Sequence, residues 1–302
     1  MRIFYPNIHN LPSSFMSWVF YGIVAFCLFL PLSLAAETAV WKVSHSDRTL
    51  YLAGTIHVLA QQDYPLPEEF NQAYQKSDML VFETDLNAMG KPAVQASISE
   101  RMRYQPGHSL KDDLSEKTYR LLTQYVSSQG LSMALFDSYK PPMVMISLMM
   151  MELNRLGLAQ AGVDNHFLQK AVREHKPLGE LESLETQIHI LENMGKGFED
   201  EMILSTLEEM QELPTVMAAM KKAWREGNLK QLEDLAITPM RRDYPDLYRL
   251  LLVERNRSWL PVLERFLATP DVEMILVGAL HLAAEQGLIQ ALKNKGYQVE
   301  PY

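Results

Sequence analysis

TLYLAGTIHVL, residues 49–59, and EMILVGALHL, residues 273–282, are the two stretches that decide the fold. Each is a run of apolar and β-favouring residues that reaches a glycine and, three positions later, a histidine, His57 or His281. Each run predicts a buried strand whose glycine turns the chain with a positive φ and whose histidine begins the next helix. Ligands of open α/β sheets bind beyond the carboxyl ends of the strands. We therefore expect the two imidazoles to approach one ion or substrate, although a histidine after a strand can also be purely structural.

The first 35 residues have the composition of a secretory leader. Ser17–Leu34 carries no charged side chain, and Arg2 is the only charged residue before it. Small residues at Ala35 and Ala36 suit cleavage by a signal peptidase. An uncleaved anchor is the alternative, because the apolar run is close to the ~18 residues needed to span a bilayer. We expect a cleaved signal peptide, residues 1–35, and an exported protein, periplasmic or extracellular, that meets a membrane only through an uncleaved leader.

The charge and the cysteine content narrow the chemistry of the mature chain. Loss of the leader removes Arg2 and no acid, so the formal charge changes from −9 to −10. An acidic chain lacks the basic face that nucleic-acid binding requires, and we expect no nucleic-acid partner. Cys27, the only cysteine, lies in the leader, so no thiol remains for a disulfide, a nucleophile or a metal ligand. Any metal ion must be bound by His, Asp and Glu.

Strand-like segments cluster at the two ends of the mature chain. The predicted strands are 40–45, 49–54, 79–82, 178–181, 273–278 and 297–302. Between about 90 and 270 the pattern is mainly helical, and residues 198–236 predict two separate helices. This order predicts an α/β fold with one mixed central sheet, formed from N- and C-terminal strands, and a long helical insertion. No flexible linker divides the chain, so residues 36–302 are expected to form a single domain.

Several polar residues follow the predicted strands and are the candidates for a functional site. The sequence contains no H-E-x-x-H, G-x-S-x-G, P-loop or G-x-G-x-x-G motif. The candidates are His57, Glu83, Asp85, Glu182 and His281. Two histidines and one carboxylate, with positions left for water, recur in metal-assisted hydrolysis. We predict that His57, Glu83 and His281 bind a divalent ion, although the spacing does not choose among zinc, manganese, cobalt and iron, and Glu83 alone could equally be a solvated strand end.

Two further residues are predicted to act on the substrate. Glu182 is a candidate base, or an acid that interacts with the metal ligands without binding the ion itself. Arg255 lies on a helix predicted over Tyr248–Phe266. It is either half of a surface ion pair, which would contribute little, or an anchor for a carboxylate or oxyanion through bidentate hydrogen bonds.

These stretches together resemble the TraB/GumN family, also called PrgY, which is related to the TIKI metalloproteases. The matching segments, from about residue 40 to 302, are YLAGTIHVL, VFETDL, GVDNHFLQKA, KPLGELESLETQ, AWREGN, ERNRSWLP and VGALHLAAEQGLIQALKNKGYQVEPY. The resemblance implies an α/β core like that of the erythromycin-esterase (EreA)/ChaN group. It also implies a site containing the two G-x-x-H histidines, the F-E-x-D-L acid Glu83, the R-N pair at Arg255 and the L-E-x-x-x-x-Q block from Glu182 to Gln187. Ala284 departs from the family pattern, where glycine is usual.

The resemblance suggests two kinds of function. The animal relatives are described as metal-dependent proteases, whereas TraB and PrgY members are associated with shutting down peptide-pheromone signalling, which binding alone could achieve. We therefore expect an exported, metal-dependent hydrolase, a peptidase that acts on a peptide or protein substrate. The alternative is a non-catalytic protein that sequesters a peptide or, like ChaN, binds haem.

Overall fold

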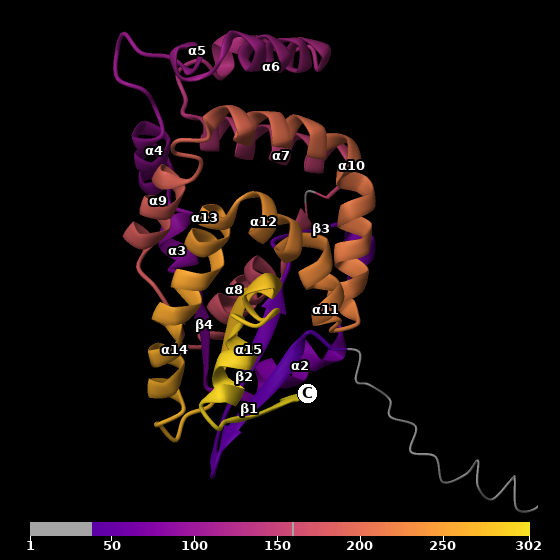
Figure 1. Ribbon diagram of the computed structural model, residues 1–302. Helices are drawn as coiled ribbons and strands as arrows, with labels where there is room; N and C mark the ends of the chain where they lie inside the picture. Colours follow the sequence, from indigo (N-terminus) through magenta and orange to yellow (C-terminus); the bar gives the residue numbers. More distant parts are fainter. Residues whose placement is uncertain (1–37, 159) are drawn as a thin grey trace, which may run out of the picture. The chain divides into compact units, whose positions relative to one another are not determined.

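Strands from both ends of the chain form one mixed sheet in the order β6-β4-β7-β2-β1-β8 (Figure 1). The computed structural model describes residues 38–158 and 160–302, so the predicted signal peptide, residues 1–35, lies outside the described residues. The strands of this sheet are β1 Val40–His45, β2 Arg48–Thr55, β4 Met79–Phe82, β6 Leu178–Glu180, β7 Glu273–Gly278 and β8 Gln298–Pro301. The predicted α/β fold with a mixed sheet is thus confirmed.

The strands that precede the candidate residues lie together in the sheet. β7 pairs in parallel with β2 on one side and with β4 on the other, and β6 pairs in parallel with β4. β1 pairs antiparallel with both β2 and β8, which closes the hairpin predicted at the start of the mature chain. Residues 273–277 of β7 are all buried. Burial on both faces of a parallel strand explains why this stretch is a continuous apolar run after Glu273 instead of an alternating one.

The helices lie mainly between β4 and β7, with α2 before β4 and α15 after β7. They are α2 Glu68–Lys76, α3 Leu86–Met89, α4 Pro92–Arg101, α5 Leu110–Asp113, α6 Glu116–Ser128, α7 Pro141–Arg155, α8 Val163–Glu174, α9 Leu184–Asn193, α10 Glu199–Arg225, α11 Leu229–Leu232, α12 Thr238–Asp243, α13 Pro245–Tyr248, α14 Glu254–Phe266 and α15 Leu288–Asn294. Two π-helical turns, η3 Glu233–Ile237 and η4 Arg249–Val253, and a 3₁₀ turn, η5 Ala279–His281, connect some of them. A second, two-stranded sheet pairs β3 Val58–Leu59 with β5 Gln160–Ala161.

Two apolar clusters stabilise the described part of the chain. The larger one surrounds the six-stranded sheet and contains the fully buried Trp224 and Trp259. The smaller one joins helices and includes Leu122 of α6, Leu148 of α7 and Ile203 of α10. Each fully buried apolar side chain contributes about 1.5–3 kcal/mol relative to an exposed one. The indole N–H of Trp224 also donates to the carbonyl of Gly54 at 2.7 Å, which fixes the end of α10 against β2.

Several local expectations are corrected by the structure. Gly54 and Gly278 do not adopt a positive φ, and Gly278 has φ −50°. Gly54 is needed for space instead, because a Cβ there would lie 3.1 Å from Leu282 and 3.3 Å from Ala279. His57 is followed by β3 and not by a helix. Residues 198–236, predicted to form two helices, contain the long helix α10, the short helix α11 and the π-helical turn η3. Helix α10 contains Pro214 and changes direction along its length (Figure 1).

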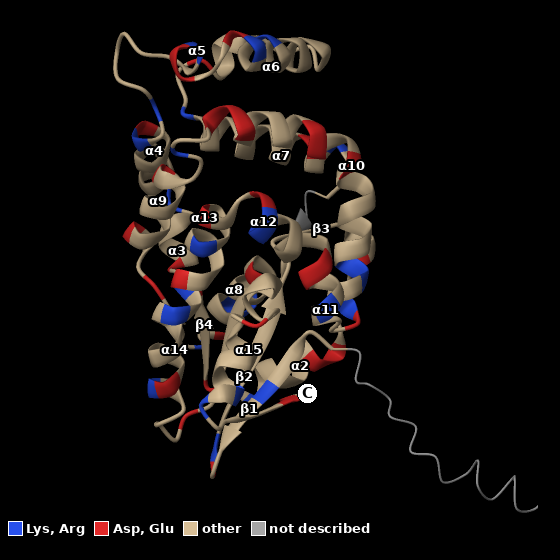
Figure 2. Cartoon of the chain, in the orientation of Figure 1, with Lys and Arg blue, Asp and Glu red and all other residues tan. Residues whose placement is uncertain are grey.

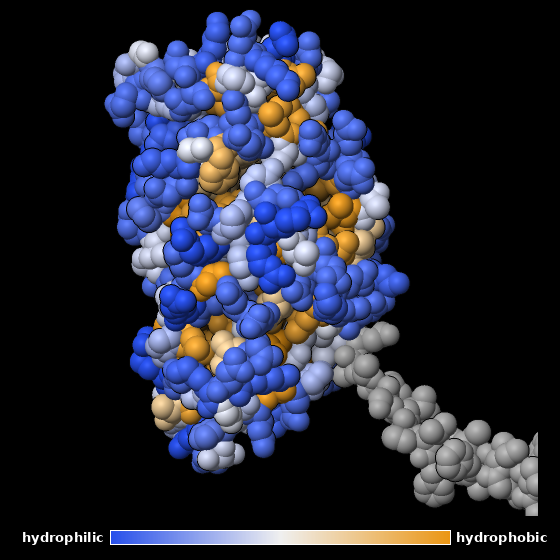
Figure 3. All heavy atoms as spheres, viewed as in Figure 1, coloured by the Kyte–Doolittle hydropathy of each residue, from blue (hydrophilic) through white to orange (hydrophobic). Residues whose placement is uncertain are grey.

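The surface of the described region carries charges of both signs. Acidic and basic residues are interspersed along the helices (Figure 2), and apolar side chains reach the surface in patches (Figure 3). No helix in residues 38–158 and 160–302 is long and apolar enough to cross a membrane.

Candidate functional site

The sheet brings His57, Glu83 and His281 to one edge. Thr55 of β2 pairs with Gly278 of β7, and Phe82 of β4 pairs with Leu276. The three candidates come after these paired positions, and β2, β4 and β7 are parallel, so their carboxyl ends coincide. Adjacent parallel strands therefore deliver two histidines and one acid to the same place.

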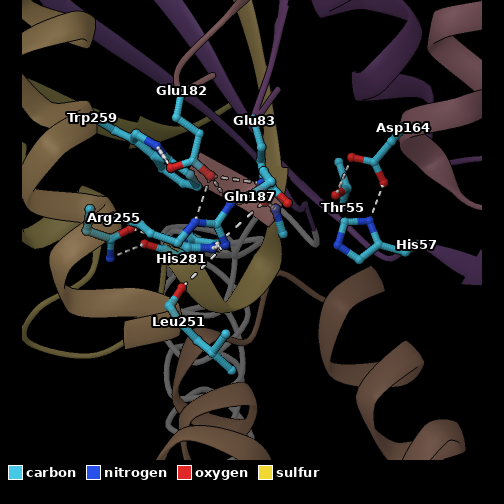
Figure 4. Close-up of polar contacts among 12 residues, drawn as sticks. Thr55, His57, Glu83, Asp164, Glu182, Gln187, Leu251, Arg255, Trp259 and His281 are labelled. Carbon is cyan, nitrogen blue, oxygen red and sulfur yellow. Dashed lines mark hydrogen bonds and ion pairs between the residues drawn. The ribbon is translucent and has the colours of Figure 1, made fainter. Parts of the chain in front are cut away.

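The three side chains surround Gly278. A Cβ built on this glycine would lie 3.4 Å from Oε1 of Glu83, 3.7 Å from Nε2 of His57 and 3.7 Å from Cδ2 of His281. Its backbone N–H donates to Oε1 of Glu83 at 2.8 Å. The absence of a side chain at this position therefore leaves a small polar space, walled by both imidazoles and one carboxylate (Figure 4).

His57 is oriented by an acid that sequence reasoning missed. Its Nδ1 lies 2.9 Å from Oδ2 of Asp164, and the hydroxyl of Thr55 donates to Oδ1 of the same carboxylate at 2.8 Å. Asp164 reaches His57 because Gly162, at the start of α8, packs directly on the backbone there: a Cβ on Gly162 would come within 2.2 Å of the His57 carbonyl carbon. Asp164 raises the pKa of His57 to about 9. The side chain is 68% exposed, so this end of the site is open to solvent.

His281 is held in the opposite environment. Its side chain is 5% exposed, and its Nδ1 lies 2.7 Å from Oδ1 of Asn256. The amide nitrogen of Asn256 donates to the carbonyls of His281 and Gln286, so Oδ1 is left to accept a proton from Nδ1. Burial lowers the pKa of His281 to about 3, and the ring is therefore neutral at pH 7 with its lone pair on Nε2. Nη1 of Arg255 donates to that nitrogen at 3.1 Å.

Arg255 connects the acids of the site to His281. Nη2 donates to Oε2 of Glu83 at 2.5 Å, and Nε donates to Oε1 of Glu182 at 3.0 Å. The guanidinium also stacks 4.5 Å from the ring of Trp259. Burial would lower the pKa of Arg255, but the two carboxylates raise it above its ordinary value. Arg255 is thus a buried positive charge fixed by two anions, and not half of a surface pair.

Glu83 is kept ionised although it is buried. Burial alone would raise its pKa, yet His281, Arg255, His57 and the Gly278 amide together lower it to about 2. His281 is neutral at pH 7, so the positive charges that keep Glu83 ionised there are the guanidinium of Arg255 and the protonated ring of His57. Its Oε1 receives the Gly278 amide and points to the space shared with the two imidazoles.

Glu182 lies behind Arg255 and has few free acceptor positions. Its backbone N–H donates to the carbonyl of Glu83 at 2.9 Å, which continues the pairing of β6 with β4. Its carboxylate accepts the side-chain N–H groups of Gln187 and Trp259, each at 2.8 Å, in addition to Arg255. The side chain is 5% exposed. The arrangement directs Glu182 toward Arg255 rather than toward solvent.

Not every predicted residue belongs to this cluster. Asp85 caps α3 by accepting the N–H of Ala88 at 2.9 Å. Asp164 and Trp259 were missed, because neither belongs to a catalytic motif; the only signal for Asp164 is an acid at the start of a helix after a glycine. In the described ranges no group of three or more His, Asp and Glu side chains is arranged to hold a metal ion as it stands.

The donor chemistry of the cluster nevertheless suits a divalent ion. In metal sites a ligating histidine usually donates its other ring N–H to an oxygen, which fixes the ring and its tautomer. Asp164 and Asn256 supply such oxygens to His57 and His281. Nε2 of His57 lies at the space beside Gly278, and Nε2 of His281 lies 3.8 Å from Oε1 of Glu83. Two features compete with an ion: the hydrogen bond from Arg255 to Nε2 of His281, and the proton that His57, with a pKa of about 9, keeps on Nε2 at neutral pH.

Comparison with known proteins places this geometry in a family. The model of the TraB/PrgY/gumN family matches residues 39–301. The chain is 27% identical over 249 residues to the uncharacterized protein YbaP of Escherichia coli K12, an alignment that covers 82% of this chain and 89% of YbaP. The YbaP protein of Shigella flexneri matches with the same identity and coverage. No solved structure matches the chain.

Proposed function

The chain belongs to the TraB/PrgY/gumN family, and from that premise we propose that it is an exported hydrolase that uses a divalent metal ion to cleave peptide bonds. One observation carries the proposal: Nε2 of His57, the His281 ring and Oε1 of Glu83 surround the space beside Gly278, while an oxygen fixes the far nitrogen of each imidazole. Export rests on the predicted leader, residues 1–35. The likeness to the erythromycin-esterase/ChaN fold is part of the same proposal.

In this proposal His57, His281 and Glu83 hold the ion, which would be zinc, manganese or cobalt. A bound divalent ion would polarise the substrate carbonyl and lower the pKa of a water molecule. Glu83 can contribute Oε1 while Oε2 keeps its bond to Arg255, so the acid stays ionised throughout.

Arg255 has the second role in the proposal. Once Nε2 of His281 is engaged elsewhere, Nη1 of Arg255 keeps only its 3.4 Å hydrogen bond to the carbonyl of Leu251, and its other N–H can donate to a substrate carboxylate or oxyanion. Glu182 already accepts from three donors, so we assign it to positioning Arg255 and not to removing a proton from water.

Metal content tests the proposal first. Purified wild-type protein dialysed against zinc, manganese or cobalt should retain about one divalent ion per chain. His57→Ala and His281→Ala should lose it, whereas His45→Ala, which changes an exposed histidine at the end of β1, should retain it. A peptide-library digest should show cleavage only by loaded protein. Stoichiometric metal in both site variants, or cleavage by metal-free protein, would overturn the assignment.

One observation favours a non-catalytic alternative. Arg255 already balances Glu83 and Glu182, so the acids are satisfied without a metal ion. A protein that only sequesters a peptide would bind peptides without metal and leave them intact, and a haem-binding protein would show a Soret band when mixed with haem. Either result, together with metal-free wild-type protein, selects this alternative over the hydrolase.

A further inference from the structure

A cavity of about 450 Å³ lies outside the candidate site, between α7, α10, η3 and α12. Four methionines line it, and the aromatic rings of Phe198 and Tyr244 stack across one end with centroids 6.3 Å apart. The methionines are Met145, Met149, Met202 and Met240. We call this space the methionine cavity. Figure 3 shows apolar side chains at the surface of this region, near α10 and α12.

The size and the lining of the methionine cavity fit a ligand with bulky apolar groups. Its volume falls within the roughly 300–1,000 Å³ typical of ligand pockets. Methionine side chains are flexible and polarizable, and they adapt to apolar partners of different shapes. The π-helical turn η3 contributes Leu235 and Ala236 to the wall, and such turns are frequent at functional sites.

The charged groups of the methionine cavity are all acidic. Glu209 and Glu212 of α10 and Asp243 line it, and no Lys, Arg or His does so among the described residues. Asp243 is paired with Arg242, but no described residue forms an ion pair with Glu209 or Glu212. Both residues are exposed, and partial burial and the neighbouring Glu208 raise the pKa of Glu209. A ligand that carries a positive charge would supply the missing partner.

We propose that the methionine cavity binds a peptide segment in which bulky apolar side chains adjoin a lysine or arginine. The apolar side chains enter between α10 and α12, and the cationic group pairs with Glu209 and Glu212. Binding of the peptide to the cavity does not depend on the proposed hydrolase function. Cleavage of the bound peptide rests on that function.

The position of the cavity also favours a peptide over a small molecule. Leu247 lines the cavity and Arg255 stands in the candidate site, eight residues further along the continuous helical run of α13, η4 and α14. Eight helical residues correspond to about 12 Å. An extended peptide covers that distance with about four residues. One short peptide is therefore long enough to contact both the methionine cavity and the candidate site.

Isothermal titration with matched peptides tests the inference. The probes are the acetylated and amidated peptide LFLKLG and its counterpart LFLELG, each added to metal-free wild-type protein. The lysine peptide should bind about tenfold more tightly at low salt, the size expected when a charged group gains a hydrogen-bonded partner. In the double variant Glu209→Gln, Glu212→Gln this preference should disappear. Equal binding of the two peptides by wild-type protein, or binding of neither, overturns the inference.

Two further variants separate a binding role from general damage. Glu208→Gln changes an exposed acid beside Glu209 that does not line the cavity, and it should keep the lysine preference. Ala236→Phe should fill the cavity and abolish binding of both peptides while the thermal unfolding midpoint stays near that of wild type. Loss of the preference in Glu208→Gln, or unchanged binding in folded Ala236→Phe protein, contradicts the inference.

The same peptides keep this inference distinct from the proposed function. His45→Ala protein, changed at an exposed position outside both the methionine cavity and the candidate site, should bind the lysine peptide as wild type does. Lysine-selective binding without cleavage by metal-loaded protein would overturn the hydrolase and support the cavity. Cleavage that is equally fast in the Glu209→Gln, Glu212→Gln variant would support the hydrolase and overturn the cavity as its substrate site.

Discussion

Arg255→Met should destabilise the metal-free protein by about 3–5 kcal/mol, the usual cost of removing one partner from a buried ion pair. The substitution keeps a long side chain beside Trp259 but leaves Glu83 and Glu182 facing each other without a cation. The pKa of Glu83 gives an upper limit for one part of this loss, because His281, His57 and the Gly278 amide contribute to its shift besides Arg255. A carboxyl held at about 2 instead of the ordinary 4.5 contributes about 3 kcal/mol of stability above pH 4.5.

The effect should depend on pH with a defined sign. In wild type, Glu83 binds fewer protons in the folded than in the unfolded state between pH 4.5 and 2, so its stabilising contribution is lost as the pH falls through that range. In Arg255→Met the guanidinium no longer opposes the effect of burial, so the pKa of Glu83 rises. Its carboxyl group is then protonated in mildly acidic solution. The difference between variant and wild type is therefore larger at pH 7.5 than at pH 5.

Urea unfolding followed by circular dichroism at the two pH values measures this difference. Arg257→Met is the matched control, because Arg257 lies on the same helix and is exposed; it should change the free energy of unfolding by less than about 0.5 kcal/mol. If Arg255→Met and Arg257→Met unfold alike, or if the loss is greater at pH 5, Arg255 does not hold the two acids in the way that the structure indicates.

Three further predictions concern two residues of β7 and the acid that contacts His57. Burial raises the pKa of Glu273 to about 7, so the folded protein keeps this proton between pH 4.5 and 7 and loses stability as the pH rises. Glu273→Gln should therefore raise the free energy of urea unfolding by about 1–3 kcal/mol at pH 8 but little at pH 4.5. The control Glu300→Gln, at an exposed strand position, should show no such difference. Gly278→Ala should shift the thermal midpoint little, because φ −50° suits alanine, yet reduce metal content, since its Cβ enters the space beside Glu83; unchanged metal content contradicts the proposed site. Asp164→Asn should lower the pKa of His57 from about 9 toward 6.5 in an NMR titration of the imidazole, and an unmoved titration means that Asp164 does not govern that ring.

The strands and their histidines were predictable because the relevant signals are local. Apolar runs ending at Gly54 and Gly278 are visible in the sequence, and the first and last strands follow from turn residues and spacing. The rule that ligands gather at the carboxyl ends of strands then indicates which side chains should meet. In the structure His57, Glu83 and His281 lie at one edge of the sheet, where that rule predicts them.

Other features depend on contacts between distant segments and leave little trace in the sequence. Asp164 lies 107 positions from His57 along the chain, and only the close packing allowed by Gly162 makes it a partner. The helix α10 continues past Pro214 because tertiary packing outweighs the local preference to break. The two motif glycines were assigned a turn, whereas one is required for packing against Leu282 and the other leaves room beside Glu83.

The central position of β7 has a consequence for how the protein is made. This strand is translated after about nine-tenths of the chain, yet it separates β2 and β4, which are among the earliest segments to leave the ribosome. Until Glu273–Gly278 arrives, the facing edges of those two strands lack their partner, and such open apolar edges are prone to aggregation and favour chaperone binding. Pairing across so long an interval is intrinsically slow. The polar cluster around Gly278 is thus among the last features to form, and a nascent chain that stops before β7 lacks both Gly278 and His281.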